Sequence, residues 1–162
     1  MTRLDLFIDR MVSQRACLNH AIAATAQIAG PVFELGLGNG RTYHHLRAAL
    51  GEDDIWVFER AIASHPDSTP PEGRVILGDV RETLVQALGR FGASVRLIHA
   101  DLGGHNSEKN DRFAREISPL IEPLLAPGGL MVSSDQMYFD TLEEQPLPHS
   151  AVPGRCFIYK QV

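Results

Sequence analysis

One acid and three glycines follow a short apolar run in the first quarter of the chain. They are Glu34, Gly36, Gly38 and Gly40. Glycines adopt positive φ readily and let a ligand approach the backbone closely. A helix expected over residues 41–50 would begin directly after them, and the free N–H groups and dipole of a helix start favour an anionic group. The spacing therefore predicts a loop that binds a ligand carrying a group such as a carboxylate.

Two other interpretations of this loop stay open. Asn39 and Gly40 between apolar runs form a hairpin-turn signal, although the helix that follows argues against it. The loop also approaches the dinucleotide fingerprint G-x-G-x-x-G, but Arg41 stands where the third glycine belongs. A nucleotide- or dinucleotide-binding α/β protein is therefore one alternative.

Two further acids each follow an apolar run. Glu59 comes directly after residues 55–58, and an acid about 20 residues beyond such glycines can accept hydrogen bonds from ribose hydroxyls. Asp79 follows residues 74–77 and precedes an expected helix, where Asp is a common N-cap. Either acid alone is an ordinary cap or exposed charge. Their order after successive strands favours a site for a nucleoside.

This series resembles the class I, Rossmann-like S-adenosylmethionine-dependent methyltransferases over residues 31–135. Residues 34–40 match their E-x-G-x-G-x-G motif, whose loop wraps the methionine end of the cofactor, and residues 124–130 resemble their L-x-P-G-G turn. The resemblance implies that Glu59 binds the ribose, that Arg60 flanks the adenine, and that Asp79 lies near the adenine amino group. The cofactor-binding residues that it implies are Glu34, Gly36, Gly38, Gly40, Glu59, Arg60, Asp79 and Val80.

The segment expected beside the methyl donor is residues 99–106 (HADLGGHN). It lacks the [DN]-P-P-[YF] motif of enzymes that methylate base amines, and also the paired glutamates of protein arginine methyltransferases. Proximity and alignment can supply most of a methyl transfer, and a base is needed only where the acceptor must lose a proton. We therefore expect Asp101 and His105 to be the catalytic residues. Each could instead be an ordinary cleft or loop residue.

The same segment is similar in part to metal-dependent small-molecule O-methyltransferases. Those enzymes carry an acid after the fourth strand and an Asp-Asn pair after the fifth. The corresponding residues here would be His99 or Asp101, with Asp135 and Gln136. Oxygen ligands would suit Mg²⁺ or Ca²⁺ and lower the pKa of an acceptor hydroxyl. Because Gln replaces Asn and His replaces an acid, we expect no metal and keep a divalent cation as the lesser alternative.

The elements that must position these residues follow from the apolar pattern. Residues 3–29 have helical spacing, with a lapse between Val12 and Leu18 that indicates a break near Ser13. Beyond Pro31, apolar runs alternate with amphipathic stretches. This alternation predicts a three-layer αβα, doubly wound, mostly parallel sheet, which binds ligands at the carboxyl ends of its strands. Strands are expected at residues 32–35, 55–58, 74–77, 95–99, 129–133 and 155–161, and helices at 41–50, 80–91 and 108–125.

The C-terminal end of this fold is expected to be shortened. Only one strand is expected beyond the fifth, where the full family fold has two more with a helix between them. Residues 140–154 hold three prolines and no periodicity, which predicts a loop, and such a loop could act as a lid. We expect a single domain over residues 1–162, with a helical segment at 1–30 and a Rossmann-like core at 31–162. The helical segment and the loop would shape the acceptor pocket or a contact in a homo-oligomer.

Composition narrows the class of function. The chain has 162 residues and a formal net charge of −5, which argues against a nucleic-acid partner. Two distant cysteines, Cys17 and Cys156, indicate free thiols in a reducing compartment. No signal peptide or membrane span is expected, so we predict a cytoplasmic protein. The leading hypothesis is methylation of a small molecule, and the alternative is a non-catalytic S-adenosylmethionine-binding module or regulatory subunit.

Overall fold

The computed structural model describes residues 1–162. The strands are β1 (Val32–Leu35), β2 (Ile55–Glu59), β3 (Val75–Leu77), β4 (Val95–Ala100), β5 (Leu125–Ser133), β6 (Leu142–Glu144) and β7 (Phe157–Gln161). The helices are α1 (Arg3–Ala24), α2 (Arg41–Leu50), α3 (Val80–Phe91) and α4 (Ser107–Ile121), with short 3-10 turns at Pro66–Ser68, Glu72–Arg74 and Glu122–Leu124.

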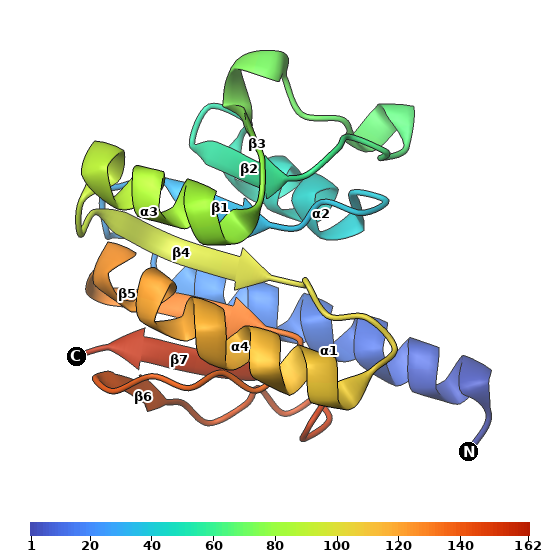
Figure 1. The fold of residues 1–162 in the computed structure, drawn as a ribbon. Helices are drawn as coiled ribbons and strands as arrows, with labels where there is room; N and C mark the ends of the chain where they lie inside the picture. Colours follow the sequence, from blue (N-terminus) through green and yellow to red (C-terminus); the bar gives the residue numbers. More distant parts are fainter.

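All seven strands form one sheet in the order β3-β2-β1-β4-β5-β7-β6. The first five strands are parallel, and β7 is antiparallel to both of its neighbours. Helices α3 and α4 cover one face, and α1 and α2 cover the other (Figure 1). Every residue of β1 and β4 is buried because both faces are covered, which explains their nearly continuous apolar runs. The predicted three-layer, mostly parallel fold is confirmed.

Helix α1 differs from the prediction in two ways. It is unbroken at Ser13, and it ends at Ala24 rather than near residue 29. Ser13 and Gln14 are buried although they are polar. Ser13 Oγ accepts a hydrogen bond from the backbone N–H of Val152, and the Gln14 amide donates to Asp101 and Ser134. The apolar spacing lapses because the helix meets polar groups at the strand ends there.

The N-terminal part of α1 projects past the carboxyl ends of β4 and β5 (Figure 1). Three of its apolar side chains are exposed, those of Leu4, Phe7 and Ile8, as is that of Met1 before the helix. A subunit contact through this face stays a prediction. None of the helices is both long and apolar enough to cross a membrane.

The C-terminal end was predicted incorrectly in part. Two strands follow β5, not one, because β6 lies within the expected loop at residues 140–154. No helix lies between β5 and β6 or between β6 and β7. Helix α4 ends at Ile121, and β5 already begins at Leu125. Residues 127–129 therefore lie in a strand whose pairing with β4 shifts register, and they do not form a separate turn.

Candidate functional site

The glycine loop connects β1 to α2 at the carboxyl edge of the sheet. Gly36, Gly38 and Gly40 have φ values of 82°, 52° and 90°, a region that residues with a Cβ rarely adopt. A Cβ on Gly36 would lie 2.8 Å from Leu102 Cδ2 and 2.9 Å from the Asp101 carbonyl oxygen. A Cβ on Gly38 would meet no atom within 4 Å. Gly36 thus permits close packing, whereas Gly38 faces open space.

Glu59 at the end of β2 holds this loop. Its Oε2 accepts hydrogen bonds from the backbone N–H groups of Leu37 at 2.8 Å and Gly38 at 3.2 Å. Its Oε1 accepts one from the backbone N–H of Arg60 at 2.8 Å. The carboxylate therefore joins the glycine loop to the end of the second strand.

Asp79 caps α3 as expected and also pairs with arginines. It accepts a hydrogen bond from the backbone N–H of Arg81 at 2.9 Å. It also forms an ion pair with the guanidinium of Arg60 at 3.1 Å. The backbone hydrogen bond from Arg81, with the side-chain hydrogen bond from Arg60 and the charge of Arg81, lowers the pKa of the Asp79 carboxyl. Asp79 thus caps the start of α3 and contacts the exposed Arg60 guanidinium.

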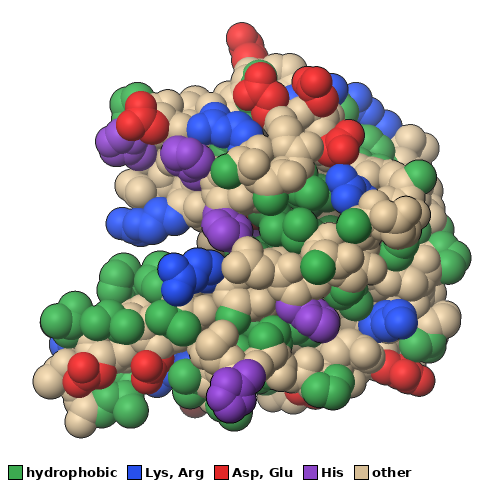
Figure 2. Space-filling model, turned by 180° about the vertical axis from the view of Figure 1, so that it is seen from behind, with side chains coloured by type: hydrophobic (Ala, Val, Ile, Leu, Met, Phe, Trp, Pro, Cys, Tyr) green, Lys and Arg blue, Asp and Glu red, His purple; other side chains and the backbone are tan.

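One cavity lies at the glycine loop, and a larger one lies at the end of β2, beside the Glu59 that holds this loop. The larger has a volume of about 670 Å³ and is lined by Glu59, Arg60, Val80, Leu102 and His105 among others. The smaller, about 220 Å³, lies between residues 36–42 and the Phe7–Gln14 part of α1. Figure 2 shows a notch above the projecting part of α1, with basic side chains on both of its sides.

These two cavities fit an elongated cofactor with a nucleoside at one end and a charged amino acid at the other. The larger has the size typical of small-molecule sites, and it is bordered by a carboxylate at the end of β2, as ribose recognition requires. In the smaller, Gly38 leaves space above its backbone, and the start of α2 favours a carboxylate.

Asp101 lies just beyond β4 and is held by the N-terminal helix. Arg10 pairs with its Oδ2 at 2.6 Å, and the Gln14 amide donates to the same oxygen at 3.0 Å. The Gln14 amide also donates to Ser134 Oγ at 2.9 Å. Helix α1 is thereby tied to the ends of β4 and β5.

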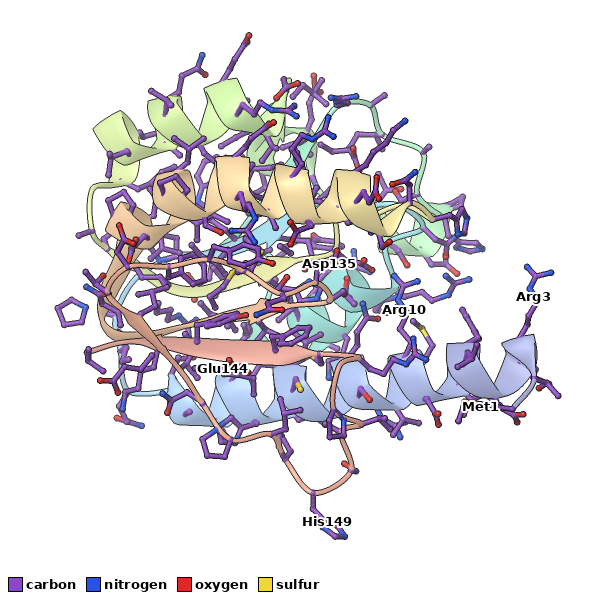
Figure 3. The ribbon with its side chains drawn as sticks, turned by 60° about the horizontal axis from the view of Figure 1, so that its bottom comes forward. Met1, Arg3, Arg10, Asp135, Glu144 and His149 are labelled. Carbon is purple, nitrogen blue, oxygen red and sulfur yellow. The ribbon has the colours of Figure 1, made fainter.

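A third cavity, of about 240 Å³, begins on the other side of Asp101. Its lining contains no hydrophobic residue; the side chains that line it are Arg10, Asp101, Asn110, Ser134, Asp135 and Arg155. Arg10 on α1 and Asp135 after β5 lie close together in Figure 3, whereas His149 is on a loop away from them. Burial, followed by the charge of Asp101, raises the pKa of Asp135.

The structure separates the two expected catalytic residues. Asp101 lines both the 220 Å³ and the 240 Å³ cavities, whereas His105 lines the 670 Å³ cavity. Sequence reasoning did not identify Arg10, Gln14, Asn110 or Arg155. The lapse in apolar spacing near Ser13 was the one signal that pointed toward the contacts of α1.

Glu34 is fully buried beneath the glycine loop. Its Oε1 accepts hydrogen bonds from His99 Nδ1 at 2.9 Å and from the Thr42 hydroxyl at 2.7 Å. Burial alone would lower the pKa of His99, but the charge and hydrogen bond of Glu34, with the charge of Asp101, outweigh it and raise that pKa. Glu34 does not line the three cavities described above.

The residues considered for a metal do not form a metal site. His99 is turned toward Glu34, and the Asp101 carboxylate is bound by Arg10 and Gln14. The structure contains no group of three His, Cys, Asp or Glu side chains that could hold a metal ion.

Solved structures share this fold. A crystal structure of an S-adenosyl-L-methionine methyltransferase from Silicibacter pomeroyi DSS-3 is 73% identical, covers 100% of this chain and 99% of that one, and has a TM-score of 0.97. A Burkholderia thailandensis 1,6-didemethyltoxoflavin-N1-methyltransferase is 14% identical over 98% of this chain and 81% of its own, with a TM-score of 0.56. An RNA methyltransferase from Salinibacter ruber is 17% identical over 91% of this chain and 87% of its own, with a TM-score of 0.51.

No curated protein matches the sequence. A family model described as S-adenosyl-L-methionine methyltransferase matches residues 1–161. The predicted cofactor, S-adenosylmethionine, and the predicted class of enzyme are thereby confirmed, and the dinucleotide alternative is set aside. The chain therefore belongs to the S-adenosyl-L-methionine methyltransferase family.

Proposed function

We propose that this methyltransferase acts on a small polar molecule bound between α1, the ends of β4 and β5, and the residues before β7. The observation that carries the proposal is the polar cavity of about 240 Å³, which shares Arg10 and Asp101 with the cavity beside the glycine loop. Its volume lies below the ~300–1,000 Å³ of typical drug-sized sites. A small acceptor with polar groups suits such a cavity.

The cofactor would lie along the two other cavities. Glu59 would accept hydrogen bonds from the ribose hydroxyls, while Arg60, Asp79 and Val80 would border the adenine. Gly36, Gly38 and Gly40 would lie under the methionine part. Glu34 would act indirectly, because its hydrogen bond from Thr42 fixes the first turn of α2.

Bound S-adenosylmethionine supplies a methyl group on a positively charged sulfur. The chain's own contribution is to align the acceptor with that methyl group and to exclude water, which can provide most of the rate enhancement. Asp101 is the proposed catalytic residue at the boundary of the two cavities, where Arg10 and Gln14 fix its carboxylate. His105 would instead border the adenosine part of the cofactor, because it lines the 670 Å³ cavity.

Charge supports a small molecule over a nucleic acid. The formal net charge of −5 disfavours binding to a phosphate backbone, because such binding depends on Lys and Arg side chains that neutralise phosphates and release their counterions. Solved structures with this fold include an enzyme named for a small acceptor and one named for RNA, so the fold alone does not discriminate. Two free, buried thiols support a reducing compartment such as the cytoplasm.

Formation of S-adenosylhomocysteine by the purified protein tests the proposal. Metabolites that pass an ultrafiltration membrane are expected to support turnover, and total RNA is not. Asp101→Asn should abolish most of the turnover, while Asp53→Asn, an exposed control, should not. Methylation of RNA alone would contradict the proposed acceptor. Binding of S-adenosylmethionine without turnover of any acceptor would favour the non-catalytic module.

A further inference from the structure

We propose that the acceptor is a small zwitterion, with an amino group that binds Asp135 and an anionic group that binds Arg155. The inference rests on the proposed function, because it assigns the acceptor to the 240 Å³ cavity. It goes further by naming the chemical class of the acceptor and the two side chains that select it.

Asp135 is a carboxylate that forms no ion pair, although the charge of Arg10 acts on it from the same cavity. It lies directly after β5 and is partly buried, yet it forms none of the ion pairs in the molecule. The neighbouring carboxylate, Asp101, is already bound to Arg10. A partly buried carboxylate that lacks a counter-ion favours a ligand with positive charge.

The position of Asp135 is built into the fold. Any Cβ on Gly103 would overlap Asp135 Oδ2 and would lie 2.8 Å from Asn110 Nδ2. Asn110 is itself fixed, because its amide accepts a hydrogen bond from the Gly104 N–H at 2.9 Å and donates one to the Gly104 carbonyl at 2.9 Å. The glycine therefore leaves the space that the carboxylate occupies.

Arg155 supplies the opposite charge in the same cavity. It is partly buried just before β7, and its guanidinium takes part in no ion pair. Asp135 and Arg155 do not pair with each other, although both line the cavity. One cation and one anion are thus left for a ligand, while Arg10 and Asp101 neutralise each other.

A carboxylate beside the accepting nitrogen also suits the reaction. The ammonium group first loses a proton to solvent, and its nitrogen lone pair then forms the bond to the methyl carbon. The carbon–sulfur bond breaks, and its electron pair remains on sulfur. Positive charge therefore moves from sulfur to nitrogen, toward the Asp135 carboxylate, which stabilises the transition state more than the ground state.

Calorimetry on the protein saturated with S-adenosylhomocysteine tests the proposal. The probes are ω-amino acids from glycine to 5-aminopentanoate, together with the matching alkylamines and carboxylates that carry one charge each. At least one zwitterion is expected to bind at millimolar concentration. Its two single-charge analogues should bind about tenfold more weakly or worse, since each leaves one charged side chain unpaired.

Variants of Asp135 and Arg155 test whether these two side chains bind the two charged groups of the zwitterion. Asp135→Asn and Arg155→Gln should each weaken binding of that zwitterion about tenfold or more, with affinity for S-adenosylhomocysteine unchanged. Asp53→Asn and Arg15→Gln are matched exposed controls and should change neither affinity.

The proposal is wrong if no zwitterion of the panel binds, if single-charge analogues bind equally well, or if the two variants bind the zwitterion normally. Methylation of a small molecule that lacks either charge would overturn this inference and leave the proposed function intact. Methylation of RNA alone would overturn both.

Discussion

The 220 Å³ cavity at the glycine loop and the polar 240 Å³ cavity, proposed above to hold the acceptor and called here the acceptor-side cavity, share Asp101, yet they are built from the chain in different ways. The loop takes its residues from one stretch, Glu34 to Thr42, where alternate positive φ angles are set by glycine. The cavity combines Arg10 near the start of the chain with Arg155 near its end. A binding loop made by local backbone geometry leaves a motif in the sequence, whereas a cavity made by distant side chains does not.

The largest effect is expected beneath the loop, in the variant Glu34→Ala. It leaves the buried His99 without its partner and should lower the free energy of unfolding by about 3–5 kcal/mol. The raised pKa of His99 sets the pH dependence. The pair stabilises fully below the ordinary histidine pKa of about 6.5, and this stabilisation is lost as pH rises through the raised pKa of the folded protein.

Chemical denaturation at pH 6 and pH 9 measures this difference, which should be larger at pH 6. Glu116→Ala, which removes a partner of Arg81 on the surface, should change stability by no more than about 1 kcal/mol. An equally small effect of Glu34→Ala would mean that the buried pair does not support the loop.

Within the loop, Gly36→Ala and Gly38→Ala should act on different quantities. Both place a Cβ at positive φ, which costs about 1–2 kcal/mol. Gly36→Ala adds an overlap with Leu102 and the Asp101 backbone, so its loss of stability should be the larger, about 2–3 kcal/mol. Gly38→Ala should instead weaken S-adenosylhomocysteine binding, because its Cβ enters the cavity. Thermal unfolding and calorimetry separate the two, and identical profiles would contradict the assignment.

Glu59→Ala removes the acceptor of two loop hydrogen bonds and the proposed ribose ligand. Affinity for S-adenosylhomocysteine should fall about tenfold or more, as expected for the loss of a charged hydrogen-bond partner. Titration calorimetry measures the change, with Glu72→Ala as a control on an exposed residue. An unchanged affinity would remove Glu59 from the ribose role.

The smallest effect is expected in the acceptor-side cavity and has the opposite sign. Burial and the charge of Asp101 raise the pKa of Asp135, so its charged form destabilises the fold above that pKa. Asp135→Asn should raise the melting temperature at pH 7 by about 1–2 °C, and the gain should vanish as pH falls toward about 4. Turnover should fall at the same time. A lower melting temperature at pH 7 would show that Asp135 is stabilised by its surroundings.

Much of the fold could be predicted because β1 and β4 are wholly buried and β2 and β5 mostly so, which leaves apolar runs in the sequence. Strand β3 also has an apolar run, although it is only partly buried. The strand β6 could not, because it has three residues at the sheet edge and only Leu142 is buried. The start of β5 was missed for a different reason. Its Pro-Gly-Gly sequence is typical of a turn, but the register shift against β4 accommodates it within the strand.

The candidate site also has a part that could be predicted from the sequence and a part that could not. The glycine loop and Glu59 could be predicted, because backbone conformation and strand ends determine where they lie. Arg10 and Arg155 could not, since a single arginine in a helix or a loop is most often an exposed charge. Their importance follows from tertiary contacts that only the folded chain brings together.

The hydrogen bond between Ser13 and Val152 joins residues that are 139 positions apart. It can therefore form only after most of the chain has been synthesised. Chains emerge from the ribosome with the N-terminus first and fold as segments become available. The glycine loop and strands β1 to β5 are synthesised before Arg155 and β7. A nascent chain can thus form its cofactor loop before the wall of the acceptor-side cavity exists. On the proposed function, methyl transfer requires Arg155, which is synthesised after all five parallel strands.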